Sequence, residues 1–189
     1  MFGLYNFKRN KMFKFLLNFF VIGLPALLIA ANPQDLANLK PMETQQHVPV
    51  DLSFADLRGY DLTGMDLRRA NLKGCNFEGT DLRKINFDEA NPEGARFEGA
   101  QLRSCSFANA NLTGANFTKA AIIYCGFRGA RAEKAQFTGA NIESTSFEKS
   151  NIQNANFDEA HVTAVNFKKA IWTGASFKGI VEECVSWYW

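Results

Sequence analysis

Hydrophobic residues recur at every fifth position from residue 50 to about residue 180, without an insertion. Counting from Leu52, the central residue of each five-residue unit is Leu or Phe at 19 of 26 positions. The residue two before it is small, Ala at 15 of 26, and the residue between the two is usually Asp or Asn. A period of five fits neither the 3.6 of a helix nor the 2.0 of a strand. The pattern therefore predicts a solenoid in which each unit forms one side of a coil.

Sorting the central residues in steps of 20 gives four ladders, two almost entirely Phe and two aliphatic, in alternation. This alternation excludes coils of three or five sides, and it fills each layer of the core with two rings and two aliphatic side chains. One ladder of small positions holds larger residues, which we expect to push that edge outward: Met65, Ile85, Cys105, Cys125, Thr145, Val165 and Val185.

Individual units carry a recognisable consensus. The segments Ala70-Asn71-Leu72-Lys73-Gly74 and Ala115-Asn116-Phe117-Thr118-Lys119 resemble the A(D/N)LxX unit of the pentapeptide-repeat proteins, and the resemblance covers about residues 50–180. It implies an all-β fold, a right-handed quadrilateral parallel β-helix of about 6.5 coils. In that fold the central residue and the small residue point inward, and the other three positions of each unit point outward.

The N-terminal segment differs from the repeat. Residues 1–14 are basic and residues 15–31 are apolar apart from Asn18, which is typical of a secretory signal peptide with a leader helix. Small Ala30 and Ala31 would suit cleavage, but Leu28 or Ile29 at the −3 position is imperfect, so an uncleaved membrane anchor is the alternative. Either reading places the repeat domain outside the cytoplasm, in the periplasm, a lumen or the exterior. A buried core helix would not explain the basic flank.

Two short segments flank the repeat. Residues 32–49 are predicted to form a short helix followed by a polar linker. Residues 181–189 end on Trp187, Tyr188 and Trp189, which we expect either to cover the last open coil as an aromatic cap or to form half of an end-to-end dimer contact.

Charge and composition narrow the function. The net charge of +2 hides four bases in the first 14 residues, which leave 17 Lys and Arg against 19 Asp and Glu in the rest of the chain. Direct nucleic-acid binding is therefore not expected. The two His residues have no metal-site or triad spacing, so the sequence offers no catalytic, cofactor-binding or metal-binding residues. We expect no enzyme and no cofactor.

The four cysteines leave a choice open. Cys105 and Cys125 are 20 residues apart and would stack in adjacent coils, within the distance range of a disulfide. Packed free thiols, a disulfide and, least of all, a metal site are the three alternatives for this pair. Cys75 and Cys184 are expected to be unpaired.

Outward positions must hold any binding site. Arg83 and Arg103 are one coil apart, and Ile123 and Tyr124 follow at outward positions in the next coil. These exposed apolar residues above two arginines form a candidate interaction patch, with harmless drift of the repeat as the alternative.

Three functions follow from these patterns. The first is a non-enzymatic exported scaffold or protein-interaction module, whose partner is an unidentified protein. The alternative, implied by the family resemblance, is a DNA-mimicking inhibitor or protector of DNA gyrase. The nearly neutral repeat, the export signal and the lack of a loop interrupting the repeats all argue against it. An enzyme is the third and has no supporting residue.

Overall fold

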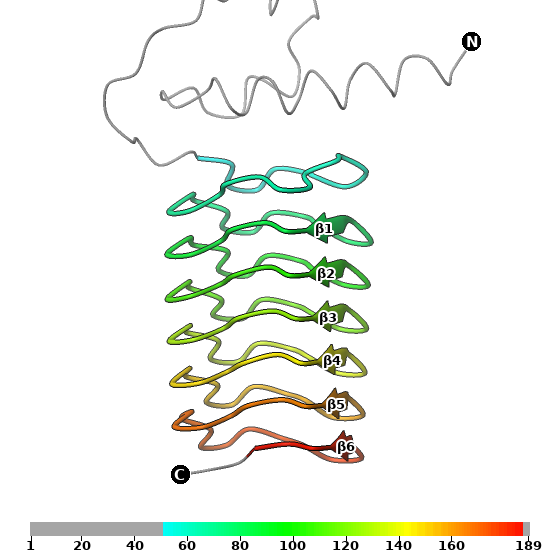
Figure 1. Ribbon diagram of the computed structural model, residues 1–189. Helices are drawn as coiled ribbons and strands as arrows, with labels where there is room; N and C mark the ends of the chain where they lie inside the picture. Colours follow the sequence, from blue (N-terminus) through cyan, green and yellow to red (C-terminus); the bar gives the residue numbers. More distant parts are fainter. Residues whose placement is uncertain (1–50, 187–189) are drawn as a thin grey trace, which may run out of the picture.

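The computed structural model describes residues 51–186, which form a rod of stacked coils (Figure 1). The predicted leader of residues 1–31, the helix and linker of residues 32–49, and Trp187, Tyr188 and Trp189 lie outside the described residues. Residues 51–186 contain no helix long and apolar enough to cross a membrane.

Six short strands lie in one column along the rod: β1 (Asp81–Arg83), β2 (Gln101–Arg103), β3 (Ala121–Ile123), β4 (Asn141–Glu143), β5 (His161–Thr163) and β6 (Val181–Glu183). They form one parallel sheet in the order β1-β2-β3-β4-β5-β6. Each strand pairs with the next at a shift of 20 residues, as in Leu82↔Leu102. The chain therefore makes five full turns from β1 to β6, which confirms the predicted solenoid. The total of about 6.5 coils stays a prediction.

The other three sides of the coil pair in the same register, but through single bridges such as Asn71↔Asn91, Asn76↔Arg96 and Asn86↔Ser106. Each unit ends in a corner whose residue, two after the central one, has φ between 48° and 74°. Eleven of these corner residues are Gly, which adopts positive φ without a steric penalty. Four corners per 20 residues make the coil four-sided.

The Asp or Asn before each central residue shapes the following corner. Its side-chain oxygen accepts a hydrogen bond from the backbone N–H two residues later, as from Thr118 to Asn116 at 2.9 Å. Asp and Asn are favoured here because a short side chain can satisfy a turn N–H that has no partner within the turn. The polar position of the repeat is therefore explained by turn formation.

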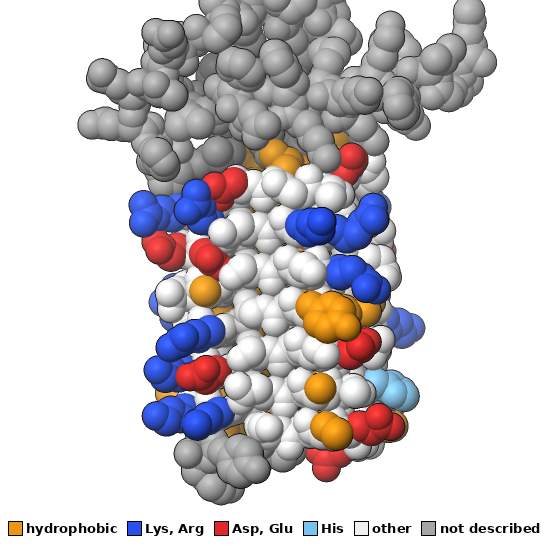
Figure 2. Space-filling model, viewed as in Figure 1, with side chains coloured by type: hydrophobic (Ala, Val, Ile, Leu, Met, Phe, Trp, Pro, Cys, Tyr) orange, Lys and Arg blue, Asp and Glu red, His pale blue; other side chains and the backbone are white. Residues whose placement is uncertain are grey.

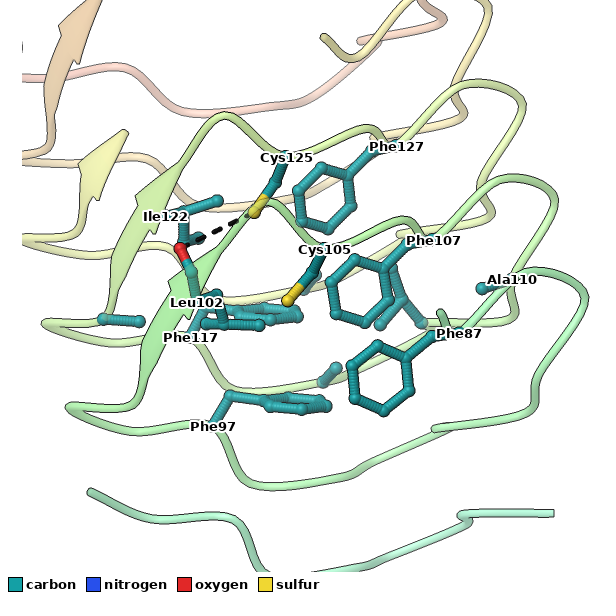
Figure 3. Packing of buried hydrophobic residues seen from close by; sticks show 14 of the residues in the cluster. Phe87, Phe97, Leu102, Cys105, Phe107, Ala110, Phe117, Ile122, Cys125 and Phe127 are labelled. Carbon is teal, nitrogen blue, oxygen red and sulfur yellow. Dashed lines mark hydrogen bonds between the residues drawn. The ribbon is translucent and has the colours of Figure 1, made fainter. Parts of the chain in front are cut away.

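The core consists of the predicted ladders. Rings within a Phe ladder stack, as Phe97 and Phe117 do with centroids 4.6 Å apart and planes 1° from parallel. Rings of the two ladders meet edge to face, as Phe137 and Phe147 do at 5.6 Å and 90° (Figure 3 shows the same packing for neighbouring rings). Both geometries are favourable for aromatic pairs. The Phe content of the repeat is thus mostly core packing.

The corner after the strands is built differently from the other three. At those, the central carbonyl accepts a hydrogen bond from the small residue three later, as Leu72 does from Cys75 at 3.0 Å. After β2 to β6 the described chain bends without this hydrogen-bonded turn. This is the corner of the larger ladder that runs through Ile85, Cys105, Cys125, Thr145 and Val165, which are all buried. Larger residues thus coincide with an open turn, and that side extends into three-residue strands.

Candidate interaction surface

The outward side chains of β1–β6 form one side of the rod, which we call the β-face. They are the first and third residues of each strand, because the central residue points into the core. Parallel register aligns Arg83 with Arg103 and Arg103 with Ile123, each one coil apart. The structure therefore brings together three of the four residues of the predicted patch in one row.

A shallow depression of about 200 Å³ lies on this part of the β-face. Buried Leu102 is among its lining residues, and the others come from the outward rows of three strands: Asp81, Arg83, Gln101, Arg103, Ala121 and Ile123. Tyr124 does not line the depression. It lies at the corner that follows β3, with φ of 55° and 55% of its surface exposed. The predicted patch is thus a hollow lined by two arginines and an isoleucine, with a tyrosine at the adjoining corner.

The two arginines differ in their surroundings. The Arg83 guanidinium forms a bidentate ion pair with Asp81, with Nη2 2.8 Å from Oδ2 and Nε 2.9 Å from Oδ1. Arg103 is exposed, and within residues 51–186 the structure shows no ion pair for it. Arg103 is therefore the free cation of the depression, ready to meet an acidic group.

The opposite half of the β-face carries the opposite charge. Glu143 on β4 and Glu183 on β6 are outward residues, and β4, β5 and β6 carry no Lys or Arg. Figure 2 shows the resulting order down this column: basic over β1 and β2, hydrophobic in the middle and acidic toward β6. Sequence reasoning missed this half, although the same 20-residue spacing aligns Ile123 with Glu143.

A second, larger depression of about 450 Å³ lies toward the start of the described residues. It is lined by Gly59, Tyr60, Asp61, Thr63, Gly79, Thr80, Asp81 and Arg83. Thr80 is 3% exposed, and its Oγ1 has no hydrogen-bond partner among the described residues. Tyr60 stands at a position that is Ala in the coils of residues 100–160, and residues 61–62 form no strand or bridge.

The cysteines are all free thiols, so the structure contains no disulfide between Cys105 and Cys125. Cys75, Cys105 and Cys125 are buried, whereas Cys184 is exposed. Burial raises the pKa of Cys75 to about 12. The hydrogen bond with the Cys105 thiol, together with burial, raises the pKa of Cys125. No group of three or more His, Cys, Asp or Glu suited to a metal ion occurs among residues 51–186.

The C-terminal end of the described rod exposes apolar side chains. Ile171 is 51% exposed, Val181 52% and Trp172 37%, and Glu182 replaces the aliphatic central residue in the last strand. An open coil with exposed apolar groups needs a cover. The cap or dimer contact predicted at Trp187, Tyr188 and Trp189 stays a prediction, because those residues lie outside the described part of the chain.

Two family profiles, both of pentapeptide repeats, match this chain. A family profile described as a pentapeptide repeat region matches residues 100–181. A second, described as pentapeptide repeats in eight copies, matches residues 51–88 and 81–118. Together the two profiles cover the described repeat almost completely. The comparison with curated proteins gives no match.

Several solved structures are similar. One of QnrB1, a plasmid-mediated fluoroquinolone resistance protein, is 22% identical over 69% of this chain and 70% of that one, with a TM-score of 0.43. HetL of Nostoc sp. strain PCC 7120, described as involved in the regulation of heterocyst differentiation, is 18% identical over 73% and 87%, with a TM-score of 0.18. A pentapeptide repeat protein of the Arabidopsis thaliana thylakoid lumen is 28% identical over 64% and 59%, with a TM-score of 0.15. At TM-scores below 0.5, these likenesses say nothing about a shared function.

Proposed function

Because the chain belongs to the pentapeptide-repeat family, we propose that it is a non-enzymatic, exported interaction module whose rigid rod presents the β-face to a protein partner. The observation that carries the proposal is the depression between Arg83, Arg103 and Ile123, with Tyr124 at its side. Exposed aromatic and Arg side chains are the types that dominate binding energy at protein interfaces. An acidic group on the partner would pair with Arg103.

Rigidity supports this role. Every central Phe from Phe77 to Phe157 is fully buried, and the rings stack continuously from coil to coil. A continuous core fixes the outward side chains relative to one another, so the surface needs little ordering when it binds. The rod therefore suits a scaffold whose specificity lies in its outward residues.

Binding through the β-face can be tested inside cells. A photo-crosslinking phenylalanine analogue in place of Tyr124 should give a specific covalent adduct, and Arg103→Glu should reduce its yield. The same analogue in place of exposed Arg131, on another side of the rod, is the matched control. Identical adducts at both positions, or none at position 124, would contradict the proposal.

Export is the second part of the proposal. We propose that residues 1–31 direct the chain out of the cytoplasm, so that the rod lies in the periplasm, a lumen or the exterior, and that residues 15–31 contact the membrane if they are not removed. Fractionation with N-terminal sequencing tests this. A mature start near Asn32 in an extracytoplasmic fraction is expected, whereas an intact soluble cytoplasmic chain would overturn export.

A DNA-mimicking inhibitor of gyrase is the weaker proposal. Mimicry needs a continuous acidic surface, but the carboxylates of Asp56, Asp66 and Asp81 are each paired with an arginine two residues later at 2.6–2.8 Å. Such local neutralisation works against a duplex-like field. We expect no inhibition in a gyrase supercoiling assay, and strong inhibition would revive this function.

A further inference from the structure

We propose that the β-face also binds a second copy of this chain, docked antiparallel, with the two-fold axis along strand β3. The inference rests on the proposed function, because it names a partner for the same surface. It follows from how charge and apolar residues are ordered along six strands in one register.

The charge order makes the two halves of the β-face complementary. The half on β1 and β2 carries Arg83 and Arg103, followed at the corner by Lys84, against the single acid Asp81. The other half carries Glu143 and Glu183, and no Lys or Arg on its strands. A surface with one basic and one acidic half is complementary to itself only when it is inverted.

The register decides which residues would meet. The strands of the sheet are evenly spaced, about 4.8 Å apart. A half-turn about an axis along β3 therefore places β2 against β4 and β1 against β5 of the second copy. Arg103 then faces Glu143 of the second copy, and the symmetry makes this pair twice. In the neighbouring row Asp81 faces His161 of the second copy, whose ring N–H can donate to the carboxylate. Gln101 faces Asn141, which supplies an amide pair.

The centre of this arrangement is apolar. On the axis, Ile123 meets its own copy and Ala121 meets its own, and both are half-buried already. No charged residue lies on β3, so no buried charge is left unpaired at the centre. Tyr124, 55% exposed at the corner that follows β3, adds an aromatic ring from each copy at that end of the apolar strip. An apolar centre with charged pairs around it is the usual organisation of a protein interface.

A parallel arrangement fits the same surface less well. If the axis ran along the rod, each strand would face the same strand of the other copy. The half-turn would exchange the first and third rows, so Arg103 would face Gln101 and Glu143 would face Asn141, and the two basic halves would lie together. Like charges brought together at an interface are unfavourable, and only the antiparallel arrangement places Arg103 opposite Glu143, so we favour that arrangement.

The size of the β-face predicts a weak dimer. Five strands of three residues span about 24 Å by about 10 Å, at the usual spacing of strands and of residues along them. Stable interfaces bury about 800 Å² on each partner, which is more than this footprint provides. We therefore expect reversible association at micromolar or higher concentration.

Charge exchange tests the pairing. Sedimentation equilibrium of the full chain should show a monomer–dimer equilibrium, and added salt should weaken the dimer. A mild non-ionic detergent in the buffer prevents association through residues 15–31. Arg103→Glu and Glu143→Arg should each raise the dissociation constant about tenfold, since each change affects two symmetric pairs. The double variant should return to within about threefold of the wild-type value. Arg131→Glu, the same change on another side, should have no effect.

Crosslinking tests the orientation. In a Cys184→Ser background, Ile123→Cys lies on the axis and should give a disulfide-linked dimer on mild oxidation, whereas Arg131→Cys should give none. A chain that is monomeric at all concentrations overturns self-association, and so does a dimer that Arg103→Glu and Arg131→Glu weaken equally. In either case a crosslink from position 124 to a different protein would still support the proposed function. Failure of self-association can therefore be told apart from failure of the proposed function.

Discussion

The Sγ atom of Cys105 donates a hydrogen bond of 2.7 Å to the carbonyl oxygen of Leu82, which lies 23 residues earlier in the preceding coil. Leu82 is the central residue of β1, and its carbonyl pairs with β2 in the parallel ladder instead of accepting the turn hydrogen bond found at the other corners. Cys125 and Thr145 repeat the contact, to Leu102 at 3.6 Å (Figure 3) and to Ile122 at 3.2 Å. At this corner the carbonyl of the central residue pairs with the next strand instead of closing the turn, and the side chains of this ladder add a second hydrogen-bond donor to it.

Thr145→Val should destabilise the rod because it removes the hydroxyl from this ladder. Thr145 Oγ1 donates to the carbonyl of Ile122 or of Glu143, and it accepts from the backbone N–H of Cys125 at 3.2 Å. Valine has nearly the same shape, so the change isolates the hydrogen bonds. The free energy of unfolding, measured by urea denaturation, should fall by about 1–3 kcal/mol.

Thr80→Val is the matched change, and we expect it to raise the free energy of unfolding where Thr145→Val lowers it. The Thr80 hydroxyl is buried, and no hydrogen-bond partner is recorded for it within residues 51–186. Replacing it by a methyl group removes a desolvated polar atom, so the free energy of unfolding should rise by about 1 kcal/mol. Equal effects at Thr80 and Thr145 would contradict the assignment of the two hydroxyls.

Thiol reactivity should separate the four cysteines. A thiol reagent at pH 8 should modify only Cys184 in the folded chain, because the other three are buried and the pKa of Cys75 is raised to about 12. All four should react once the chain is unfolded without a reductant. Only two reactive thiols after unfolding would instead indicate a Cys105–Cys125 disulfide.

The core and the surface differ in how far the sequence predicts them. Phe117 and its ladder follow directly from residues 20 apart, because one fixed period sets both the stacking and the inward direction. The open corner did not follow, because it depends on whether the carbonyl of a central residue such as Leu102 bonds within its own turn or to the next strand. The Arg103 half of the β-face was predicted from its exposed apolar neighbours, while Glu143 lacked such a signal and needed the strand register.

The Asp56 carboxyl should titrate well below its usual pKa. A side-chain hydrogen bond from Arg58 at 2.7–2.9 Å is the main reason why the pKa is lowered from 3.8 to about 2. A lowered pKa stabilises the fold above about pH 4, and that contribution is lost as the pH falls from about 4 to about 2. Its size should be small, since both side chains are 53% exposed. NMR titration of Asp56 should show the shift, and Arg58→Ala should largely abolish it.

Removing a ring from the middle of a Phe ladder should cost more than removing one from its end. Phe117 stacks on Phe97 and Phe137, meets Phe107 and Phe127 edge to face, and is fully buried. Phe117→Ala should lower the free energy of unfolding by about 3–5 kcal/mol, because the rigid coils on both sides cannot collapse into the cavity.

Phe177 is the matched position at the end of the same ladder. It is only half-buried, and it stacks on Phe157 at 4.9 Å. Since the last coil can relax, Phe177→Ala should cost about 1–2 kcal/mol in the same urea measurement. Because each coil contacts only its neighbours, the Phe117 change should also broaden the unfolding transition, whereas the Phe177 change should leave its slope unaltered. Equal losses at the two positions would show that residues beyond 186 bury Phe177 as deeply as the coils bury Phe117.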